Sequence, residues 1–355
     1  MKPVIAAMLS VAGLELTDAE KHLLEHANPM GVTLFKRNVQ DKKQVKALVQ
    51  SVKEVIGRDD VLVAVDQEGG RVCRFAPPEW PNYVSQYSLG SLNGKNGEEI
   101  TRLHGALIAA DLRDLGVNWN YAPVLDVAYP DTTIALKNRI FSENEKEVAA
   151  RGKILLDVYQ ENGICPCVKH LPGHGRAVVD PHLNLPILPQ SLKELEKDFY
   201  PFHAVGRDAP AGMTAHIVIR EVDNKPVTQS KKAIQEIIRG MIGFKGLLIS
   251  DAIDMKALSG TLTERTQTSL DAGCDAICYC FGIEDELKEV IRACRPLTDK
   301  AMDRFAKIKE IIGIKAPKLD REKVYCRYAE LATKTKSLAT DYDAVEVLHK
   351  MKGQK

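Results

Sequence analysis

The segment with the densest set of chemically active side chains runs from Lys169 to Pro186 and reads KHLPGHGRAVVDPHLNLP. It holds three histidines, a lysine and an aspartate among glycines and prolines, a composition typical of a loop. A solvated polar loop is the simplest interpretation. Asp180 and His182, however, are separated by one residue, so a short turn allows the carboxylate to orient the imidazole through one ring nitrogen. The other nitrogen is then free to donate and recover a proton, as a general acid and base does.

Other polar side chains end short apolar runs at five places along the chain. These residues are Asp66, Asp126, Lys169, His170, His216 and Asp251. Any one of them has a simple structural explanation, and Asp251 in particular fits as the cap of the following helix. Five such strand ends are better explained by one shared site. In that site Asp251, on a rigid strand end, is the candidate nucleophile.

A metal site is an alternative interpretation of the same side chains. His170, His174, His182, His216 and Asp251 resemble the ligand set of an amidohydrolase. Such a set begins with an H-x-H pair on the first strand, where this chain reads VAGLE. We therefore expect neither a metal nor an organic cofactor.

Apolar runs of strand length alternate with helical patterns along most of the chain. The expected strands are Val4–Leu9, Gly31–Phe35, Val61–Asp66, Asn118–Val124, Ile164–Lys169, Gly212–His216, Leu247–Asp251 and Ala276–Cys280. This alternation implies parallel strands joined by helical crossovers, and eight such units predict an α/β fold, the (β/α)8 TIM barrel. A doubly wound open sheet is the alternative. In the barrel, chemistry takes place at the carboxyl ends of the strands, where the polar residues fall.

The predicted catalytic barrel spans residues 1–313. Residues 314–355 break the alternation and predict a charged, helical C-terminal tail that packs outside the barrel, with KLDREKVYCRYAELATKTKSLA as its clearest helix. The longest irregular stretch within the barrel region, Arg74 to Asn96, is expected to form a loop at the rim of the site.

Charge and cysteine usage limit the partners and the compartment. Lys and Arg total 49 and Asp and Glu total 48, which excludes a strongly basic or acidic surface and argues against nucleic acid or membrane as partner. The apolar run near the N-terminus is shorter than a secretory signal and precedes a helix that Thr17 is expected to cap. The pairs Cys165/Cys167 and Cys278/Cys280 lie in strand-like runs, so we expect buried, reduced thiols and a cytoplasmic protein.

Four segments of the chain resemble glycoside hydrolase family 3. They read VAVDQEGGRVCRF, KHLPGHGRAVVDPH, GMTAHIVIREVDNKPVTQS and GFKGLLISDAIDMKAL. The similarity runs from about Lys2 to Gly282 in the right order. It is to the single-domain bacterial β-N-acetylglucosaminidase branch, which acts in peptidoglycan recycling. The histidine loop is specific to that branch, because other members use a carboxylic acid from another domain.

The resemblance implies a role for each candidate residue. Asp251 is the implied nucleophile, His182 the general acid and base, and Asp180 its partner. The implied sugar-binding residues are Asp66, Arg74, Arg139, Lys169 and His170. The implied reaction is retaining hydrolysis that releases N-acetylglucosamine from the non-reducing end of N-acetylglucosaminyl muropeptides or chito-oligosaccharides. We expect a monomer that acts on these small molecules.

Two departures and two rival functions accompany this assignment. Pro181 stands where relatives have serine, and IALKN precedes Arg139 where they have a glycine-containing turn. A related hydrolase or phosphorylase with another sugar preference is one rival, because a neutral histidine does not repel an incoming phosphate. A catalytically silent sugar-binding protein is the other, and the presence of Asp251, Asp180 and His182 argues against it.

Overall fold

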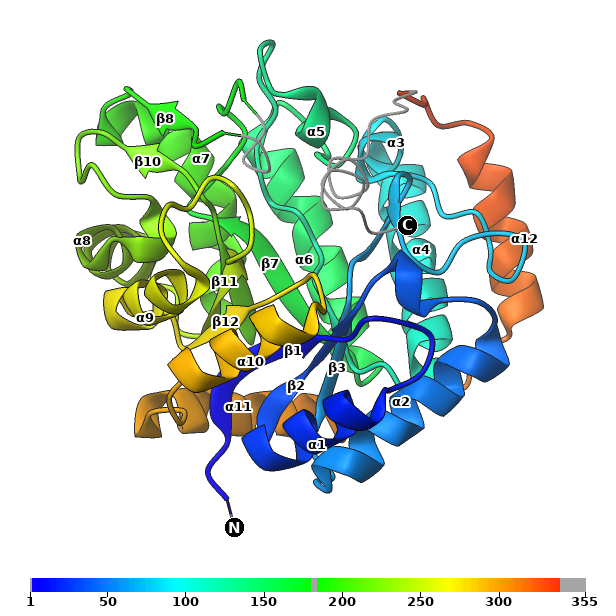
Figure 1. Ribbon diagram of the computed structural model, residues 1–355. Helices are drawn as coiled ribbons and strands as arrows, with labels where there is room; N and C mark the ends of the chain where they lie inside the picture. The colour runs from blue at the N-terminus through cyan, green and yellow to red at the C-terminus, as the bar shows by residue number, and fades with distance from the viewer. Residues whose placement is uncertain (1, 180–183, 339–355) are drawn as a thin grey trace.

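The structure is a computed structural model that describes residues 2–179 and 184–338. Within them, eight parallel strands form a closed barrel in the order β1-β12-β11-β9-β7-β6-β3-β2 (Figure 1). The barrel strands are β1 (Ile5–Ser10), β2 (Pro29–Leu34), β3 (Leu62–Val65), β6 (Trp119–Asn120), β7 (Cys165–Leu171), β9 (Ala211–Thr214), β11 (Leu247–Ala252) and β12 (Ala276–Cys278). The predicted (β/α)8 barrel is confirmed, and each predicted strand overlaps one of these strands.

The barrel strands are buried on both faces, which explains why they could be predicted from the sequence. Every residue of β2, β3, β7 and β9 is buried. Helices cover the outside and side chains fill the inside, so each strand reads as a nearly continuous apolar run. At Gly31 the neighbouring strand approaches so closely that a Cβ atom would lie 1.8 Å from the backbone oxygen of Leu62.

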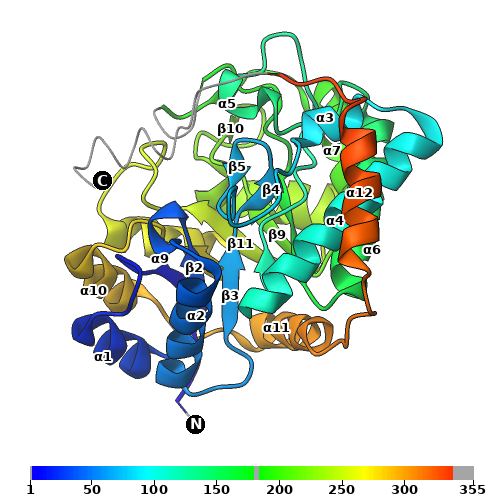
Figure 2. The ribbon, with the colours of Figure 1, turned by 90° about the vertical axis from the view of Figure 1, so that its right-hand side faces the viewer.

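A helix follows each barrel strand on the outside of the barrel (Figures 1 and 2). These helices are α1 (Asp18–Ala27), α2 (Lys42–Ile56), α4 (Gly94–Leu115), α6 (Glu145–Glu161), α7 (Leu192–Ala204), α8 (Lys231–Ala233) with the π-helical η4 (Ile234–Met241), α9 (Leu262–Ala272) and α10 (Glu284–Ala293). Local capping sets several of their starts. Thr17 caps α1 as predicted and forms a capping box with Glu20, and Asp41 caps α2.

Two further helices complete the described chain. Helix α11 (Asp299–Ile312) lies below the barrel in Figure 1 and contacts β7 and β11. Helix α12 (Arg321–Ala332) packs against α4 on the outside of the barrel, as Figure 2 shows. The amino ends of the strands are therefore covered, and the carboxyl ends face the opposite side.

The loops at the carboxyl ends contain most of the short elements. These are η1 (Lys36–Asn38), the hairpin β4 (Gln67–Gly69) and β5 (Val72–Cys73), α3 (Gln86–Gly90), α5 (Ile134–Lys137), β8 (Ile187–Leu188) paired with β10 (Val218–Ile219), and η3 (Val227–Gln229); η2 (Gly206–Asp208) instead follows α7. The predicted irregular stretch from Arg74 to Asn96 is interrupted by α3 and by the start of α4. The prolines of this stretch and the five-residue length of α3 hid the helix, although its cap, Ser85, is a helix-start signal.

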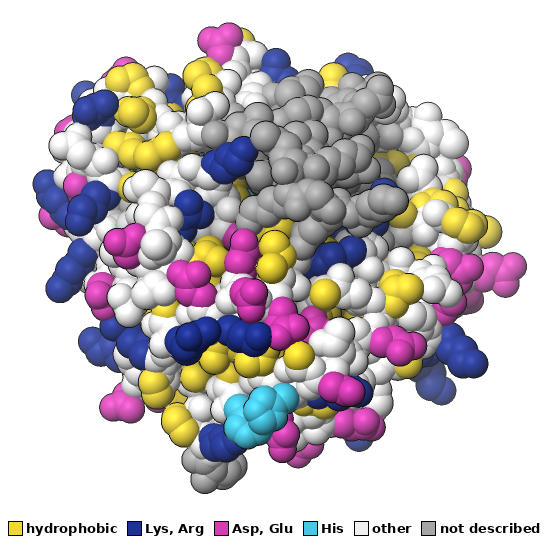
Figure 3. All heavy atoms as spheres, viewed as in Figure 1, with side chains coloured by type: hydrophobic (Ala, Val, Ile, Leu, Met, Phe, Trp, Pro, Cys, Tyr) yellow, Lys and Arg dark blue, Asp and Glu magenta, His cyan; other side chains and the backbone are white. Residues whose placement is uncertain are grey.

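The surface and the cysteines agree with an ordinary globular enzyme. Acidic and basic side chains are interspersed over the described part of the face in Figure 3, and the net charge is +1. All eight cysteines lie within the described residues as free thiols, with Cys165, Cys167, Cys274 and Cys278 buried and Cys280 only partly buried. Among the helices that the structure describes, none has the length and apolarity needed to cross a membrane.

Candidate active site

A buried cluster of charged side chains lies at the carboxyl ends of β3 and β7. Lys169, on β7, is 1% exposed, and its Nζ lies 2.7 Å from Asp66 Oδ1 and 2.6 Å from Glu68 Oε1. Asp66 directly follows β3, and Glu68 belongs to the hairpin strand β4. Both carboxylates reach Lys169 because β3 and β7 flank the two-residue strand β6 in the barrel.

Two arginines extend this cluster. Arg139 makes a bidentate pair with Glu68, with Nε 2.9 Å from Oε2 and NH2 2.8 Å from Oε1. Arg74 NH2 lies 3.2 Å from Asp66 Oδ2, and its guanidinium lies 5.6 Å from the ring centre of Phe35. Asp66, Arg74, Arg139 and Lys169, four of the predicted sugar-binding residues, are thus brought together. We call these four with Glu68 the charged cluster.

The IALKN segment forms helix α5, and Arg139 follows it. The backbone oxygen of Arg139 accepts a hydrogen bond from Gln86 Nε2 at 2.9 Å, and Arg71 Nε donates to Asn138 Oδ1 at 3.0 Å. The departure from the family pattern therefore still leaves the arginine beside Glu68. Arg71 thus ties the hairpin to the residue before Arg139.

The protonation states in the charged cluster follow from burial opposed by strong pairing. Burial alone would raise the pKa of the Asp66 carboxyl, but Lys169 and Arg74 hold it well below its usual value. Burial opposes ionisation of Glu68 in the same way, yet Arg139 and Lys169 lower its pKa to about 2. Burial would lower the pKa of Lys169, but the two carboxylates raise it. All these groups are charged at neutral pH.

A second pairing fixes His170. Its Nδ1 lies 2.7 Å from Asp126 Oδ2, and the backbone N–H groups of His170 and His174 donate to Asp126 Oδ1 at 3.3 and 2.7 Å. A carboxylate can only accept, so Nδ1 carries the proton and Nε2 is left as an acceptor, 3.4 Å from Arg139 NH2. The predicted sugar-binding residue His170 therefore has one defined tautomer, which Asp126 sets.

Asp251 lies at the end of β11 and is half-buried. Its backbone N–H donates to Thr214 Oγ1 at 3.2 Å, and its Oδ1 accepts from the N–H of Ala252 at 2.8 Å. Asp251 on β11 and Asp66 directly after β3 thus lie at the carboxyl ends of two strands of the same barrel. Asp251 also acts on the pKa of His174.

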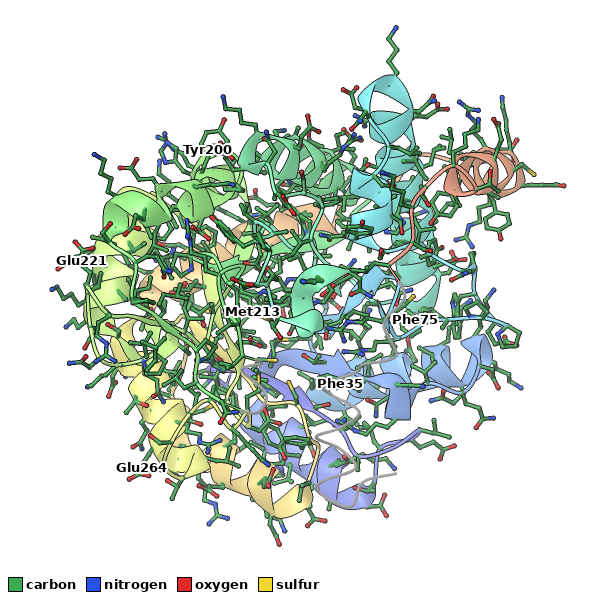
Figure 4. The ribbon with its side chains drawn as sticks, turned by 90° about the horizontal axis from the view of Figure 1, so that it is seen from above. Phe35, Phe75, Tyr200, Met213, Glu221 and Glu264 are labelled. Atoms are coloured by element: carbon green, nitrogen blue, oxygen red, sulfur yellow. The ribbon has the colours of Figure 1, made fainter. Side chains whose placement is uncertain are left out.

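Figure 4 looks down on this end of the barrel. Phe35, after β2, and Met213, on β9, lie toward the middle of the view, whereas Glu221 and Glu264 lie at its edge. Phe35 and Met213 thus come from strands β2 and β9, which are distant in sequence and lie on opposite sides of the barrel.

The remaining histidines of this region differ in their surroundings, because neither ring nitrogen of the buried His174 has a hydrogen-bond partner among the described residues, whereas both nitrogens of His216 do. His216 Nδ1 lies 2.8 Å from Thr228 Oγ1, and its Nε2 donates to the backbone oxygen of Ala252 at 2.9 Å, so both nitrogens are used. His174 is 1% exposed, and burial lowers its pKa to about 4. In residues 2–179 and 184–338, which leave out His182, no three His, Cys, Asp or Glu side chains converge on a possible metal position.

Asp180, Pro181 and His182 lie outside the described residues. The loop that leads to them is anchored where it is described. Arg176 Nε lies 2.7 Å from Asp198 Oδ2, and Thr132 Oγ1 donates to the backbone oxygen of Gly175 at 2.6 Å. At Gly175 a Cβ atom would lie 1.7 Å from the backbone oxygen of Val127, so only glycine allows this approach.

Sequence reasoning missed the roles of Glu68 and Asp126. Asp126 was recognised as a polar strand end, but nothing local indicated that it holds His170. Glu68 stands between Asp66 and two glycines in DQEGG, and this charged residue in a tight turn was the available signal.

The family described as "Glycosyl hydrolase family 3 N terminal domain" matches residues 4–310. The chain belongs to glycoside hydrolase family 3. This glycosidase is 33% identical to the beta-hexosaminidase of Bordetella avium (strain 197N) over 302 residues, covering 82% of this chain and 86% of the relative. It is 36% identical to the beta-hexosaminidase of Stenotrophomonas maltophilia (strain R551-3) over 279 residues, covering 77% and 82%.

A solved structure has the same fold. The crystal structure of NagZ from Neisseria gonorrhoeae in complex with N-trifluoroacetyl-D-glucosamine matches this glycosidase with a TM-score of 0.84 and 31% identity. The match covers 93% of this chain and 98% of that structure. This family 3 member is therefore similar to beta-hexosaminidases over nearly its whole barrel.

Glu68 predicts a specific dependence of stability on pH. Its pKa is near 2 in the folded protein and near 4.5 in the unfolded chain, so its stabilising contribution is complete above pH 4.5 and is lost as the pH falls toward 2. Glu68→Gln should lower the free energy of unfolding at pH 7 by about 3 kcal/mol, because the buried Arg139 loses its carboxylate partner and Lys169 keeps only Asp66. Across pH 4.5 to 2 the variant should lose less stability on acidification than the wild type, by up to about 1.4 kcal/mol per pH unit.

Urea unfolding at several pH values measures both effects. Asp157→Asn, which removes a carboxylate paired with Lys153 on the surface, is the matched control and should change stability by less than about 1 kcal/mol. An unchanged pH slope in Glu68→Gln would show that Glu68 is not held ionised by the cluster.

Proposed function

We propose that this glycosidase is a retaining exo-β-N-acetylglucosaminidase that releases terminal N-acetylglucosamine from peptidoglycan fragments such as GlcNAc-1,6-anhydroMurNAc peptides. The observation that carries the proposal is that the charged cluster and Asp251 lie at the same, carboxyl end of the barrel strands. The likeness to beta-hexosaminidases and to a NagZ bound to N-trifluoroacetyl-D-glucosamine supports the sugar preference. Eight free cysteines support a reducing, cytoplasmic setting.

The charged cluster suits the recognition of a sugar. The Asp66 side chain keeps 16% of its surface exposed, whereas Glu68 keeps 1%. Asp66 is therefore the carboxylate that meets substrate, and it accepts hydrogen bonds from two neighbouring hydroxyls. Arg74, Arg139 and Lys169 supply donors for hydroxyl and acetamido oxygens, and His170 Nε2 supplies an acceptor. The buried Glu68 neutralises the charges of Arg139 and Lys169.

The proposed chemistry proceeds in two steps. Asp251 attacks the anomeric carbon while His182 gives its proton to the departing glycosidic oxygen, which forms a covalent glycosyl-enzyme and releases the aglycone. His182 then takes a proton from water, whose oxygen attacks the anomeric carbon and frees Asp251. Asp180 orients the imidazole and stabilises its charged form.

The surroundings of the other histidines support the choice of His182. The ring nitrogens of His170 contact Asp126 and Arg139. Those of His216 contact Thr228 and the backbone oxygen of Ala252. His174 is buried, and its pKa near 4 makes it a poor base at neutral pH. These surroundings argue against His170, His174 and His216 as the general acid and base, which leaves His182 as the proposed one.

Product analysis tests the reaction and the sugar. Incubation with GlcNAc-1,6-anhydroMurNAc peptide should give free N-acetylglucosamine and the anhydro-muramyl peptide by mass spectrometry. Aryl glucosides, which lack the acetamido group, should be cleaved far more slowly. Formation of N-acetylglucosamine 1-phosphate in phosphate buffer would show that the reaction is phosphorolysis and not hydrolysis. Substrate that is bound but not cleaved would identify a sugar-binding protein.

Removal of the nucleophile should abolish turnover. Asp251→Ala should lower kcat on a nitrophenyl N-acetylglucosaminide by about 10⁴-fold, because the covalent route is lost. Asp271→Asn, which changes an exposed carboxylate paired with Arg295, is the control and should keep wild-type kcat. A folded Asp251→Ala with near-normal kcat would reject the nucleophile assignment.

The dual role of His182 has its own signature. With a nitrophenol leaving group protonation matters little, so His182→Ala should impair mainly the second step. A natural sugar leaving group should make the total loss larger. Azide needs no base, so it should partly restore turnover of the aryl substrate and yield a β-glycosyl azide.

His203→Ala, at an exposed position on α7, serves as the control for that experiment. Asp180→Ala should reproduce the pattern of His182→Ala more weakly, because the imidazole remains but is poorly oriented. Equal losses on both substrates, with neither azide rescue nor adduct, would make His182 a binding residue.

A further inference from the structure

Helix α12 inserts one buried tyrosine toward the barrel. Tyr328 is 1% exposed, although it belongs to a helix that lies outside the eight strands. Its hydroxyl oxygen lies 2.8 Å from the backbone nitrogen of Val84 and 3.3 Å from His104 Nδ1. The tyrosine thus joins α12 to α4 and to the stretch that follows the hairpin.

His104 continues this path to the charged cluster. It is completely buried on α4, and its Nε2 lies 3.1 Å from the backbone oxygen of Glu68. A carbonyl oxygen only accepts, so Nε2 carries the proton. Burial lowers the pKa of His104 to about 4, so the ring is neutral at pH 7 and Nδ1 is an acceptor. The Tyr328 hydroxyl therefore donates to Nδ1, and its oxygen accepts from Val84.

The hairpin that carries Glu68 is pressed against these groups. Gly69 has φ 100°, and a Cβ atom there would lie 2.3 Å from the backbone oxygen of Val84 and 2.8 Å from His104 Cε1. The N–H of Gly70 donates to the backbone oxygen of Tyr83 at 2.7 Å. The backbone on both sides of the Glu68–Gly69 peptide is therefore fixed by the groups that Tyr328 holds.

Helix α12 supports the same region through a second contact. Arg321 NH2 donates to the backbone oxygen of Ala110 at 2.7 Å, and its NH1 lies 3.4 Å from Asp111 Oδ1. The Tyr83 hydroxyl donates to Asp111 Oδ2 at 2.5 Å. The stretch that receives the hairpin is thus bound to α12 at both Tyr83 and Val84.

We infer that Tyr328, acting through His104, is a positioning residue for Glu68, and that α12 thereby sets the place of Lys169 and Arg139 in the substrate site. The role in substrate binding rests on the proposed function. Glu68 binds both cations through its carboxylate, so a shift of its backbone moves both donors relative to Asp66.

Tyr328→Phe tests the hydroxyl while keeping the ring. The change leaves His104 Nδ1 and the Val84 N–H buried without a partner, and the hairpin should loosen. Because the cluster binds the sugar in both the ground and transition states, KM for the aryl N-acetylglucosaminide should rise about tenfold with kcat within about twofold of wild type. Hydrogen exchange measured by mass spectrometry should become faster in the peptide that contains residues 67–75.

Arg327→Gln is the matched control on the same helix. Arg327 pairs with Glu99 on α4 and with Glu330 at the surface, so this variant weakens the docking of α12 without touching the Tyr328 hydroxyl. It should keep the wild-type KM and the wild-type exchange in the hairpin. The two variants are compared at equal distance below their melting temperatures.

A pair of substitutions at His104 separates positioning from packing. His104→Gln retains an N–H near the position of Nε2 that can donate to the Glu68 oxygen, whereas His104→Leu fills the space without a donor. KM should stay closer to the wild-type value in the glutamine variant than in the leucine variant.

The outcomes separate this inference from the proposed function. Wild-type KM and hairpin exchange in Tyr328→Phe, or an equal KM rise in Arg327→Gln, would overturn the inference while the proposed function stands. A wild-type protein inactive on the aryl substrate would reject the proposed function. Hydrogen exchange then decides the inference, which is supported by faster exchange in Tyr328→Phe alone and rejected by equal exchange in the two variants.

Discussion

A buried ammonium group governs the arrangement of this site. Lys169 is enclosed at the end of β7, and taking a charge of this size out of water costs several kcal/mol unless carboxylates face it directly. Asp66 and Glu68 supply those carboxylates from the end of β3 and from the following hairpin. The hairpin, the barrel register at β3, β6 and β7, and the segment of Arg139 must all be in place for the charges to balance.

The carboxylates of the site divide into two groups. Glu68 and Asp126 are enclosed and spend their oxygens on protein groups, the first on Lys169 and Arg139 and the second on His170 and backbone N–H groups. Asp66 and Asp251 keep partial exposure at the mouth of the barrel. Glu68 and Asp126 thus fix the orientation of Lys169, Arg139 and His170 before substrate arrives, which lowers the entropy lost on binding.

The fold could be read from the sequence because burial on both faces turns each barrel strand into an apolar run. The end of each run then located Asp66, Lys169, His170 and Asp251 without knowledge of contacts. The role of Glu68 could not be predicted because it depends on Arg139, 71 residues away, and no periodic pattern in the sequence indicates such a pairing. Arg139 itself came only from the family resemblance, and the roles of Asp180 and His182 stay predictions.

The support of the hairpin by α12 has a consequence for biosynthesis. His104 and Tyr328 are 224 residues apart, so the hydrogen bond between them can form only after all eight barrel strands have been synthesised. The last barrel strand leaves the ribosome about fifty residues before Tyr328, an interval on the order of 3–10 s at ordinary translation rates. During that interval the nascent chain has all its strands but lacks the contact that seats Glu68. If Tyr328 positions Glu68 as we infer, the charged cluster reaches its final arrangement only after residue 328 has left the ribosome.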